Sequence, residues 1–280
     1  MKKIIATLGA VGIISLGAQA QVLIGSGTYS QDFNTLASSG SSASWTDNST
    51  LLGWYASKAL TVSTGTYGPY AYTSYRVDSG GNNSGNLFDY GSASSTDRAL
   101  GSIASGTVAG ASGGPLANAI GLRIQNNTGS TWTGDIGISY TGEQWRQGGN
   151  TSSQVILSFS YATSATAFAS PLSATTADAA YTAVPGLSFT SPNPGTATAA
   201  AIDGNAAGNY TAISGTLSGI TLNAGGEIML RWCDINDVGN DHGGGIDDFS
   251  VTFTPQVPEP SCLALTGLGM LTLALWRRRN

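Results

Sequence analysis

The sequence predicts an all-β protein, with an antiparallel β-sandwich or jelly roll between two terminal segments that stay outside the fold. Charged residues make up only 10% of the 280-residue chain and glycine contributes 39 residues, so residues that build amphipathic helices are scarce. Apolar residues recur at every second position, as expected of strands with one buried face. We therefore expect residues 21–255 to form one large β domain.

The alternation of apolar with small or polar residues is clearest in the second half of the chain. It extends over residues 136–140, 155–161, 228–233 and 249–253. Leu122 and Ile124 indicate a further strand, which the turn-forming residues 126–129 would end. The Ala/Ser/Thr-rich stretches 162–183 and 191–209 are expected to be long loops.

The predicted domain is acidic. Residues 22–257 carry 6 basic and 15 acidic side chains, whereas the formal charge of the whole chain is only −5. Such a surface repels a phosphate backbone, which argues against nucleic acid as a partner. It is compatible with cation binding and with solubility outside the cell.

Residues 1–20 have the three-part pattern of a secretory signal peptide. Lys2 and Lys3 form the basic start, residues 4–16 are apolar, and Ala18 and Ala20 frame a small-x-small cleavage site. A permanent transmembrane helix is the alternative, but the apolar stretch is short for a full span. We expect the chain to be exported.

The C-terminal segment, residues 257–280, also has three parts. It begins with an extended stop at Val257, Pro258, Glu259 and Pro260. A short uncharged run follows, which would form a transmembrane helix. Its anchoring leucines are Leu263, Leu265, Leu268, Leu271 and Leu273. Arg277, Arg278 and Arg279 end the run and would remain on the cytoplasmic side. We expect the domain to be anchored through this tail.

The three parts of the tail, in this order, resemble the PEP-CTERM sorting signal of Gram-negative bacteria. The resemblance covers only about the last 24 residues. It implies that the chain is held transiently in the inner membrane. An exosortase, which is a membrane transpeptidase, would then cleave it near the motif. The domain would then reach the cell surface or the medium, often together with extracellular polysaccharide. A plain membrane anchor is the alternative.

Residues 135–253 resemble an extracellular jelly-roll module found in secreted bacterial proteins. The likeness rests on two segments. The first is residues 140–146 (Tyr-Thr-Gly-Glu-Gln-Trp-Arg), and the second is residues 230–237, which lead through residues 239–243 to residues 246–251. It implies a fold and a surface role but no activity.

The acidic loop is the strongest candidate for a binding site. It contains Asp234, Asp237, Asp241, Asp247 and Asp248, among many glycines. Hard cations such as Ca²⁺ bind six to eight oxygens, and a glycine-rich loop can turn its carbonyls inward. The spacing does not match an EF-hand. A structural calcium ion is therefore one prediction, and aspartates that cap turns and face water are the alternative.

The only histidine, His242, could act in a hydrolytic site together with Asp241 or Asp247 and a serine such as Ser250. Serines are too frequent here to be informative, and no Gly-x-Ser-x-Gly turn frames one. We therefore expect no catalytic residues.

Two aromatic segments are candidate sugar platforms. Trp145 could hold a sugar ring together with Glu143 and Arg146, but we favour a packed Trp145 and a Glu143 paired with a basic neighbour. The second segment contains Tyr67, Tyr70, Tyr72 and Tyr75. Exposed tyrosines stack well on sugars, although Tyr70 and Tyr72 could also share one sheet face.

These observations predict a non-catalytic secreted protein of the cell surface or extracellular matrix, sorted through its C-terminal tail. The alternative is a carbohydrate-binding module with a structural calcium site. A degradative enzyme is a more distant third hypothesis.

Overall fold

The computed structural model describes residues 22–61, 66–149, 154, 156–169, 172–173, 179–196 and 198–256. The predicted signal peptide with its cleavage site and the sorting tail from residue 257 onward lie outside these residues. Within them there is no α-helix, and the helical segments are the short 3₁₀ turns η1 (Ile24–Ser26) and η2 (Pro185–Leu187). The described part of the chain therefore has no helix long and apolar enough to span a bilayer.

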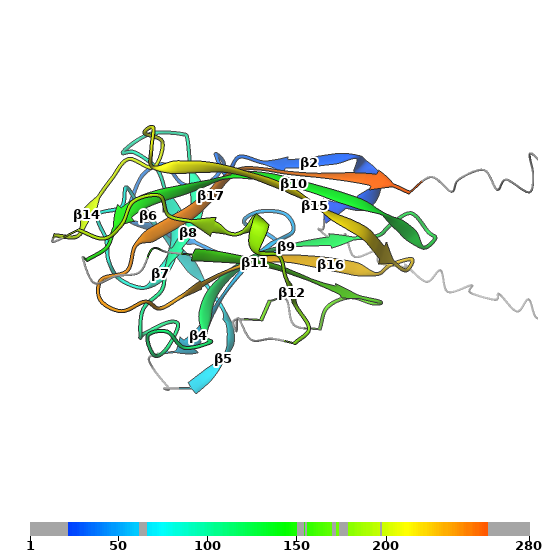
Figure 1. The fold of residues 1–280 in the computed structure, drawn as a ribbon, viewed down its shortest axis with the longest axis horizontal. Helices are drawn as coiled ribbons and strands as arrows, with labels where there is room; N and C mark the ends of the chain where they lie inside the picture. Colours follow the sequence, from blue (N-terminus) through cyan, green and yellow to red (C-terminus); the bar gives the residue numbers. More distant parts are fainter. Residues whose placement is uncertain are drawn as a thin grey trace, which may run out of the picture.

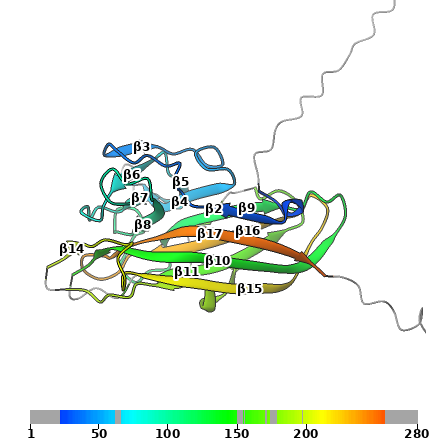
Figure 2. The same cartoon turned by 90° about the horizontal axis from the view of Figure 1, so that it is seen from above.

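Two β-sheets pack face to face as a sandwich (Figures 1 and 2). Sheet A has the order β12-β11-β16-β9-β4-β5, with β1 beside β9 and β13 beside β11. Its strands are β1 (Val22–Leu23), β4 (Trp54–Thr61), β5 (Thr66–Ala71), β9 (Ala117–Gln125), β11 (Ile156–Ser164), β12 (Thr182–Ala183), β13 (Phe189–Thr190) and β16 (Glu227–Ile235).

Sheet B has the order β14-β10-β17-β8-β7-β6-β3, with β15 beside β10 and β2 beside β17. Its strands are β2 (Thr28–Gln31), β3 (Ser42–Ser44), β6 (Ser74–Asp78), β7 (Asn86–Tyr90), β8 (Ala99–Ile103), β10 (Trp132–Gln147), β14 (Ala200–Ala201), β15 (Tyr210–Leu222) and β17 (Gly243–Pro255). The prediction of a β-sandwich is confirmed. Most pairs are antiparallel, but β1 pairs with β9 and β6 with β7 in parallel.

The predicted alternation is confirmed in β10 and β17, which have one face in the core. Ile136, Ile138 and Tyr140 are buried, while Ser139 between them is exposed. Strand β16 differs, because all but its last residue are buried on both faces. Its second face packs in a small cluster formed by Tyr55, Ala117, Ala119, Leu172, Met229 and Cys233.

The core between the sheets is aromatic and is centred on Trp232 of β16. The Trp232 ring lies nearly parallel to that of Trp54, with 6.0 Å between centroids, and meets Phe249 edge-on at 5.7 Å. Phe159 and Tyr140 pack edge-on against the same indole. Tilted and edge-to-face contacts of this kind add to the hydrophobic gain from burial.

Candidate functional site

Three of the five predicted calcium ligands are electrostatic neighbours. Asp234 is buried at the end of β16 and accepts a hydrogen bond of 2.5 Å from Oγ of Ser102 in the opposite sheet. Asp241 is buried as well, and its Oδ2 accepts a 3.4 Å hydrogen bond from the backbone N–H of Asp237. Burial raises the pKa of Asp234 to about 7 and that of Asp241 to about 8, and repulsion among the three carboxylates adds to both shifts.

The other two predicted ligands have different neighbours. Asp247 is buried in β17 opposite Thr141 of β10. Burial raises its pKa to about 8, and the nearby Glu143 and Asp248 raise it further. Asp248 is exposed, and its backbone N–H donates a 2.7 Å hydrogen bond to Oδ1 of Asp247. This local side-chain-to-backbone bond is the kind that the turn-capping alternative expects.

The structure thus separates the five aspartates into two groups. Within the described ranges, no cluster of three or more His, Cys, Asp or Glu side chains is placed to hold a metal ion. The raised pKa values mean that the buried carboxyls hold protons up to near neutral pH. The calcium site therefore stays a prediction, and the described residues offer no arrangement of these aspartates that would hold the ion.

His242 has a structural environment rather than a catalytic one. Its side chain is fully buried, and its Nδ1 lies 2.7 Å from Nε2 of Gln144 and 3.2 Å from the backbone N of Gly148. Both partners are donors, so Nδ1 accepts and the ring proton resides on Nε2. Burial lowers the pKa of this imidazole. These bonds connect the end of β10 to the start of β17 and involve none of the residues of the hydrolytic hypothesis.

Trp145 is not a sugar platform, because its side chain is buried. The Tyr90 ring stacks on it with 6.1 Å between centroids and 5° between planes. Gly204, in the segment 191–209, covers the indole so closely that a Cβ there would lie 2.4 Å from it. The packed alternative for Trp145 is therefore correct.

The expected ion pair of Glu143 with a basic neighbour is wrong. Its Oε2 accepts a 2.8 Å hydrogen bond from the indole N–H of Trp145. The guanidinium of Arg146 instead donates to the backbone carbonyls of Gly80 and Gly81. Glu143 is buried, no ion pair joins it to a basic side chain among the described residues, and burial raises its pKa to about 7.

The predicted platform around residue 70 is wrong for Tyr72 and Tyr75, while the side chain of Tyr67 lies outside the described part of the chain. Tyr72 and Tyr75 are buried, and Tyr70 is half-buried. The hydroxyl of Tyr72 donates to Oδ1 of Asn118 at 2.8 Å, and that of Tyr75 accepts from the backbone N–H of Ala37 at 3.1 Å. Both hydroxyls thus form hydrogen bonds within the domain.

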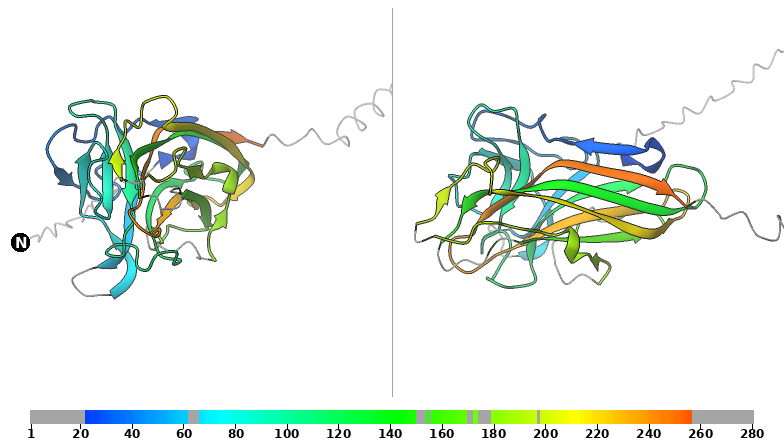
Figure 3. Two further views of the ribbon diagram at one scale, coloured as in Figure 1. Left: turned by 60° about the vertical axis from the view of Figure 1, so that its left-hand side comes forward. Right: turned by 45° about the horizontal axis from the view of Figure 1, so that its top comes forward.

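The uncovered surface lies elsewhere, on the outer face of sheet B. Strands β2, β17, β10 and β15 lie side by side there (Figure 3). Register places one serine of each strand in a row across this face, namely Ser30, Ser250, Ser139 and Ser214. The next row consists of Thr28, Thr252, Gly137 and Thr216. All of these residues are exposed or half-buried.

We call this surface the hydroxyl face. Neighbouring strands are about 4.8 Å apart, so the hydroxyl groups of a row are regularly spaced. Where two threonines adjoin, their hydroxyls bond to each other, at 3.0 Å between Thr28 and Thr252 and at 3.1 Å between Thr133 and Thr221.

Two shallow hollows follow one another along β10 and β15 on the hydroxyl face. The first, of ≈ 330 Å³, includes Gly137, Thr216 and Thr252, and the second, of ≈ 220 Å³, includes Ala212 and Asp248. Ser139 and Ser214 line both hollows, which therefore form one continuous groove.

Tyr210 lies at the end of this groove. It precedes Ala212 by two positions in β15, so the two side chains point to the same side of the sheet. Its exposed fraction is 46%, and only Leu52 and Val238 are comparably exposed large apolar residues in the part of the chain that the structure describes. The groove thus has hydroxyl groups along its length, one carboxylate at Asp248, and an aromatic ring beyond one end.

No protein-family model matches the sequence, and no curated protein sequence matches it. Solved structures of similar shape include the CBM22-1 xylan-binding domain of Xyn10C from Paenibacillus barcinonensis, at 10% identity and a TM-score of 0.30. That match covers 62% of this chain and 83% of the xylan-binding domain. A second is TmCBM61 in complex with β-1,4-galactotriose, at 7% identity and a TM-score of 0.25, over 56% of this chain and 72% of that one. These scores carry no information about a site in this chain.

Proposed function

We propose that this chain is an exported, non-catalytic protein of the cell surface or extracellular matrix, and that its β-sandwich binds polysaccharide along the hydroxyl face. The groove along Ser139 and Ser214, with Tyr210 exposed further along β15, is the observation that carries this proposal. The groove is open and continuous, and its lining is uncharged apart from Asp248, which suits a neutral polymer better than a small molecule.

The chemistry of the groove matches that of a sugar chain. Serine and threonine hydroxyls both donate and accept hydrogen bonds, as sugar hydroxyls do. From Tyr210 to Thr216, β15 extends over seven residues, about 20 Å, which is long enough for several sugar units. Bridging waters can complete such contacts without making the interface weak.

Tyr210 would supply the apolar part of the interface. Aromatic rings offer a broad apolar surface at low entropic cost and carry a polar group at one end. A sugar ring that stacks on Tyr210 would anchor the chain, while the hydroxyl rows set its direction along β10 and β15. Because the domain is acidic overall, we expect neutral polysaccharides to bind better than polyanionic ones.

The test is a binding assay with the purified full-length chain, its Tyr210→Ala variant and a matched control, Val238→Ala. Affinity electrophoresis would use xylan, galactan, a mixed-linkage β-glucan and the extracellular polysaccharide of the producing organism. We expect at least one of them to retard the wild type and the control, with about tenfold weaker binding for Tyr210→Ala, or about 1.4 kcal/mol. Equal binding by all three proteins, or binding by none, would contradict the proposal.

We also propose that the tail beyond residue 256 delivers the domain to the outside through an exosortase. The support is the order of the Pro-Glu-Pro motif, the apolar run and the three arginines in the sequence. In the producing organism, replacement of Pro258, Glu259 and Pro260 by alanine should leave the chain in the inner-membrane fraction. Normal release of this variant would show that the motif is not a sorting signal.

A further inference from the structure

A second pocket lies at another edge of sheet B, where the topology brings three chain segments together. Strands β6 and β7 are parallel, so their C-terminal ends meet, with Asp78 paired to Tyr90. Strand β8 runs antiparallel to β7 and starts at the same edge, where Ala99 pairs with Tyr90. Loop residues after β6, after β7 and before β8 therefore surround one space, and residues 38–40 complete it.

Arg98 forms the floor of this pocket and is held by a buried ion pair. Its exposed fraction is 1%, its Nε donates to Oδ1 of Asp89 at 2.6 Å, and its Nη2 donates to the Asp89 carbonyl at 2.7 Å. Gly91 gives the guanidinium its room, since a Cβ at this position would lie 2.3 Å from Nη1. Asp89 thus fixes the side edge of the guanidinium, while Nη1 has no acceptor among the described residues.

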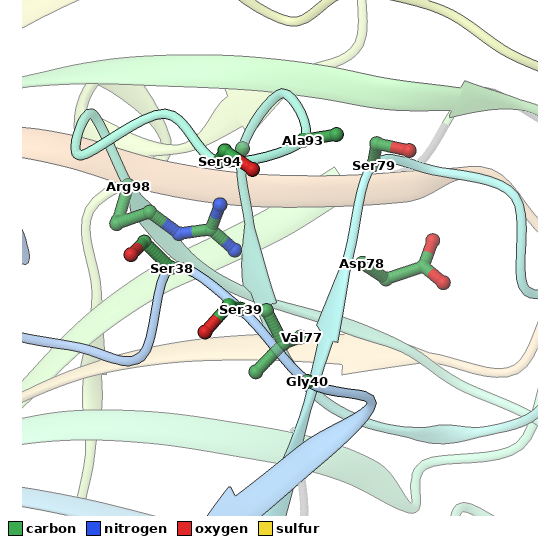
Figure 4. Close-up of a pocket in the computed structure, with 10 residues that line it drawn as sticks. Ser38, Ser39, Gly40, Val77, Asp78, Ser79, Ala93, Ser94 and Arg98 are labelled. Atoms are coloured by element: carbon green, nitrogen blue, oxygen red, sulfur yellow. The ribbon is translucent and has the colours of Figure 1, made fainter.

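The pocket is small and is lined by hydroxyl groups. Its volume is ≈ 320 Å³, at the lower end of the roughly 300–1,000 Å³ of ligand sites. Figure 4 shows the guanidinium of Arg98 pointing into the space between Ser39 and Ser94, while the carboxylate of Asp78 points away from it. Ser94 has a φ of 62°, a conformation that costs a non-glycine residue free energy and that shapes this side of the pocket.

We propose that this pocket binds a carboxylate-bearing sugar unit, a uronate, either free or at the end of a glycan. The free Nη1–Nη2 edge of Arg98 offers two parallel N–H donors, a geometry that matches a carboxylate. The hydroxyls of Ser38, Ser39, Ser79 and Ser94 can bond the ring hydroxyls of the same unit. The volume restricts the ligand to about one sugar ring.

The site is separate from the hydroxyl face. None of the residues that line the pocket also lines the groove along β10 and β15. The groove is expected to take a neutral chain, whereas the pocket selects a single negatively charged unit. Each proposal can therefore fail while the other stands.

The experiment is an isothermal titration calorimetry measurement, in which glucuronate is titrated into the purified full-length chain. Glucose tests the need for the carboxylate, acetate tests the need for the hydroxyls, and inorganic phosphate tests whether any oxyanion suffices. We expect saturable binding of glucuronate and at least tenfold weaker binding of the other three. Equal binding of glucose, acetate or phosphate, or no binding of glucuronate, would overturn the proposal.

Two kinds of variant locate the binding: one blocks the rim of the pocket and leaves the ion pair intact, and the other replaces the ion pair as a whole. Ala93→Trp places a bulky ring at the rim of the pocket and should abolish glucuronate binding, while Ser92→Trp, a neighbouring exposed position outside the lining, should not. Arg98→Met with Asp89→Leu replaces the whole ion pair by apolar groups, which domains often tolerate, and should also abolish binding. Binding that survives Ala93→Trp or the double variant would place the uronate elsewhere and refute the proposal. Tyr210→Ala should leave glucuronate binding unchanged.

Discussion

The two halves of strand β10 show how one strand can serve two different surfaces. In the first half, residues 132–141, core side chains alternate with outward-facing ones, and the outer side forms the hydroxyl face. In the second half, Gly142 to Arg146 are all buried, and the segments 191–196 and 198–209 lie against them, with hydrogen bonds to Gln144 and Trp145. The same strand thus passes from an open, hydroxyl-rich surface to an interior that contains polar groups.

The polar second half is stable because its side chains bond to one another and to the covering segment. Gln144 donates to His242 and to the carbonyl of Asn193, and it accepts from the backbone N–H of Asn193. Gly142 makes this region compact, since a Cβ there would lie 2.2 Å from the ring of Phe189. Buried polar groups are tolerated when their hydrogen bonds are made.

The largest loss of stability should come from Trp145→Ala, in the second half of β10. Trp145 is buried against Tyr90 and Gly204, so its removal leaves a large cavity and should lower the free energy of unfolding by about 3–5 kcal/mol. Urea denaturation followed by tryptophan fluorescence measures this. A loss below about 1 kcal/mol would mean that the segment 191–209 does not cover the strand as described.

The second half of β10 should also make stability depend on pH. Glu143 and Asp247 have native pKa values of about 7 and about 8, whereas both ionise near pH 4 in an unfolded chain. The native state therefore binds more protons between about pH 4 and pH 8, so the free energy of unfolding should fall as pH rises through this window.

Urea denaturation at pH 5.5 and pH 8.5 checks this sign. The wild type should be less stable at pH 8.5, and the Glu143→Gln/Asp247→Asn variant should show a smaller difference between the two pH values. His242 works in the opposite direction below about pH 6.5, where an unfolded histidine gains a proton, because burial lowers its pKa and keeps it neutral in the native state. A wild type that gains stability toward pH 8.5 would contradict the buried environment of the two carboxyls.

A smaller effect is expected of Gln144→Ala. The substitution leaves the backbone N–H of Asn193 and the Nδ1 of His242 without their side-chain partner, which should cost about 1–3 kcal/mol. Thermal and urea unfolding measure the loss. The backbone amides of residues 191–196 should also exchange faster with deuterium, and unchanged exchange would show that the bond does not hold this segment.

The smallest effect is expected in the open half. Ser139 is exposed on the hydroxyl face, so Ser139→Ala should change the free energy of unfolding by no more than about 0.5 kcal/mol. It should nevertheless weaken polysaccharide binding, since Ser139 lines both hollows of the groove. A variant with lower stability and normal binding would assign Ser139 to the fold instead.

The sandwich and much of its core were predictable from the sequence, because alternation depends only on neighbouring residues. Ile136, Ile138 and Phe249 are buried as their spacing indicated. The burial of residues 142–146 on both faces was not predictable, since it depends on a loop about 50 residues later in the chain. The parallel pair β6–β7 likewise has no local sequence signal.

The candidate site was less predictable for the same reason. Serine and threonine at the outward positions of β10 and β17 were visible as a pattern, but a row needs the register of four strands that are distant in sequence. The aromatic segments that looked suited to sugars are largely buried, whereas Tyr210, which has no aromatic neighbour in the sequence, is exposed. Arg98 carried no motif, and only the meeting of β6, β7 and β8 shows that it forms a pocket floor.

Hydroxyl-radical footprinting in the presence and absence of the bound polysaccharide tests the central claim most directly. Tyr210, Leu52 and Val238 are all exposed, so each is oxidised in the free chain and the last two act as internal controls. The proposal predicts that the polysaccharide protects Tyr210 and leaves Leu52 and Val238 unchanged. Protection of Leu52 or Val238 without protection of Tyr210 would show that the hydroxyl face is not where the polysaccharide binds.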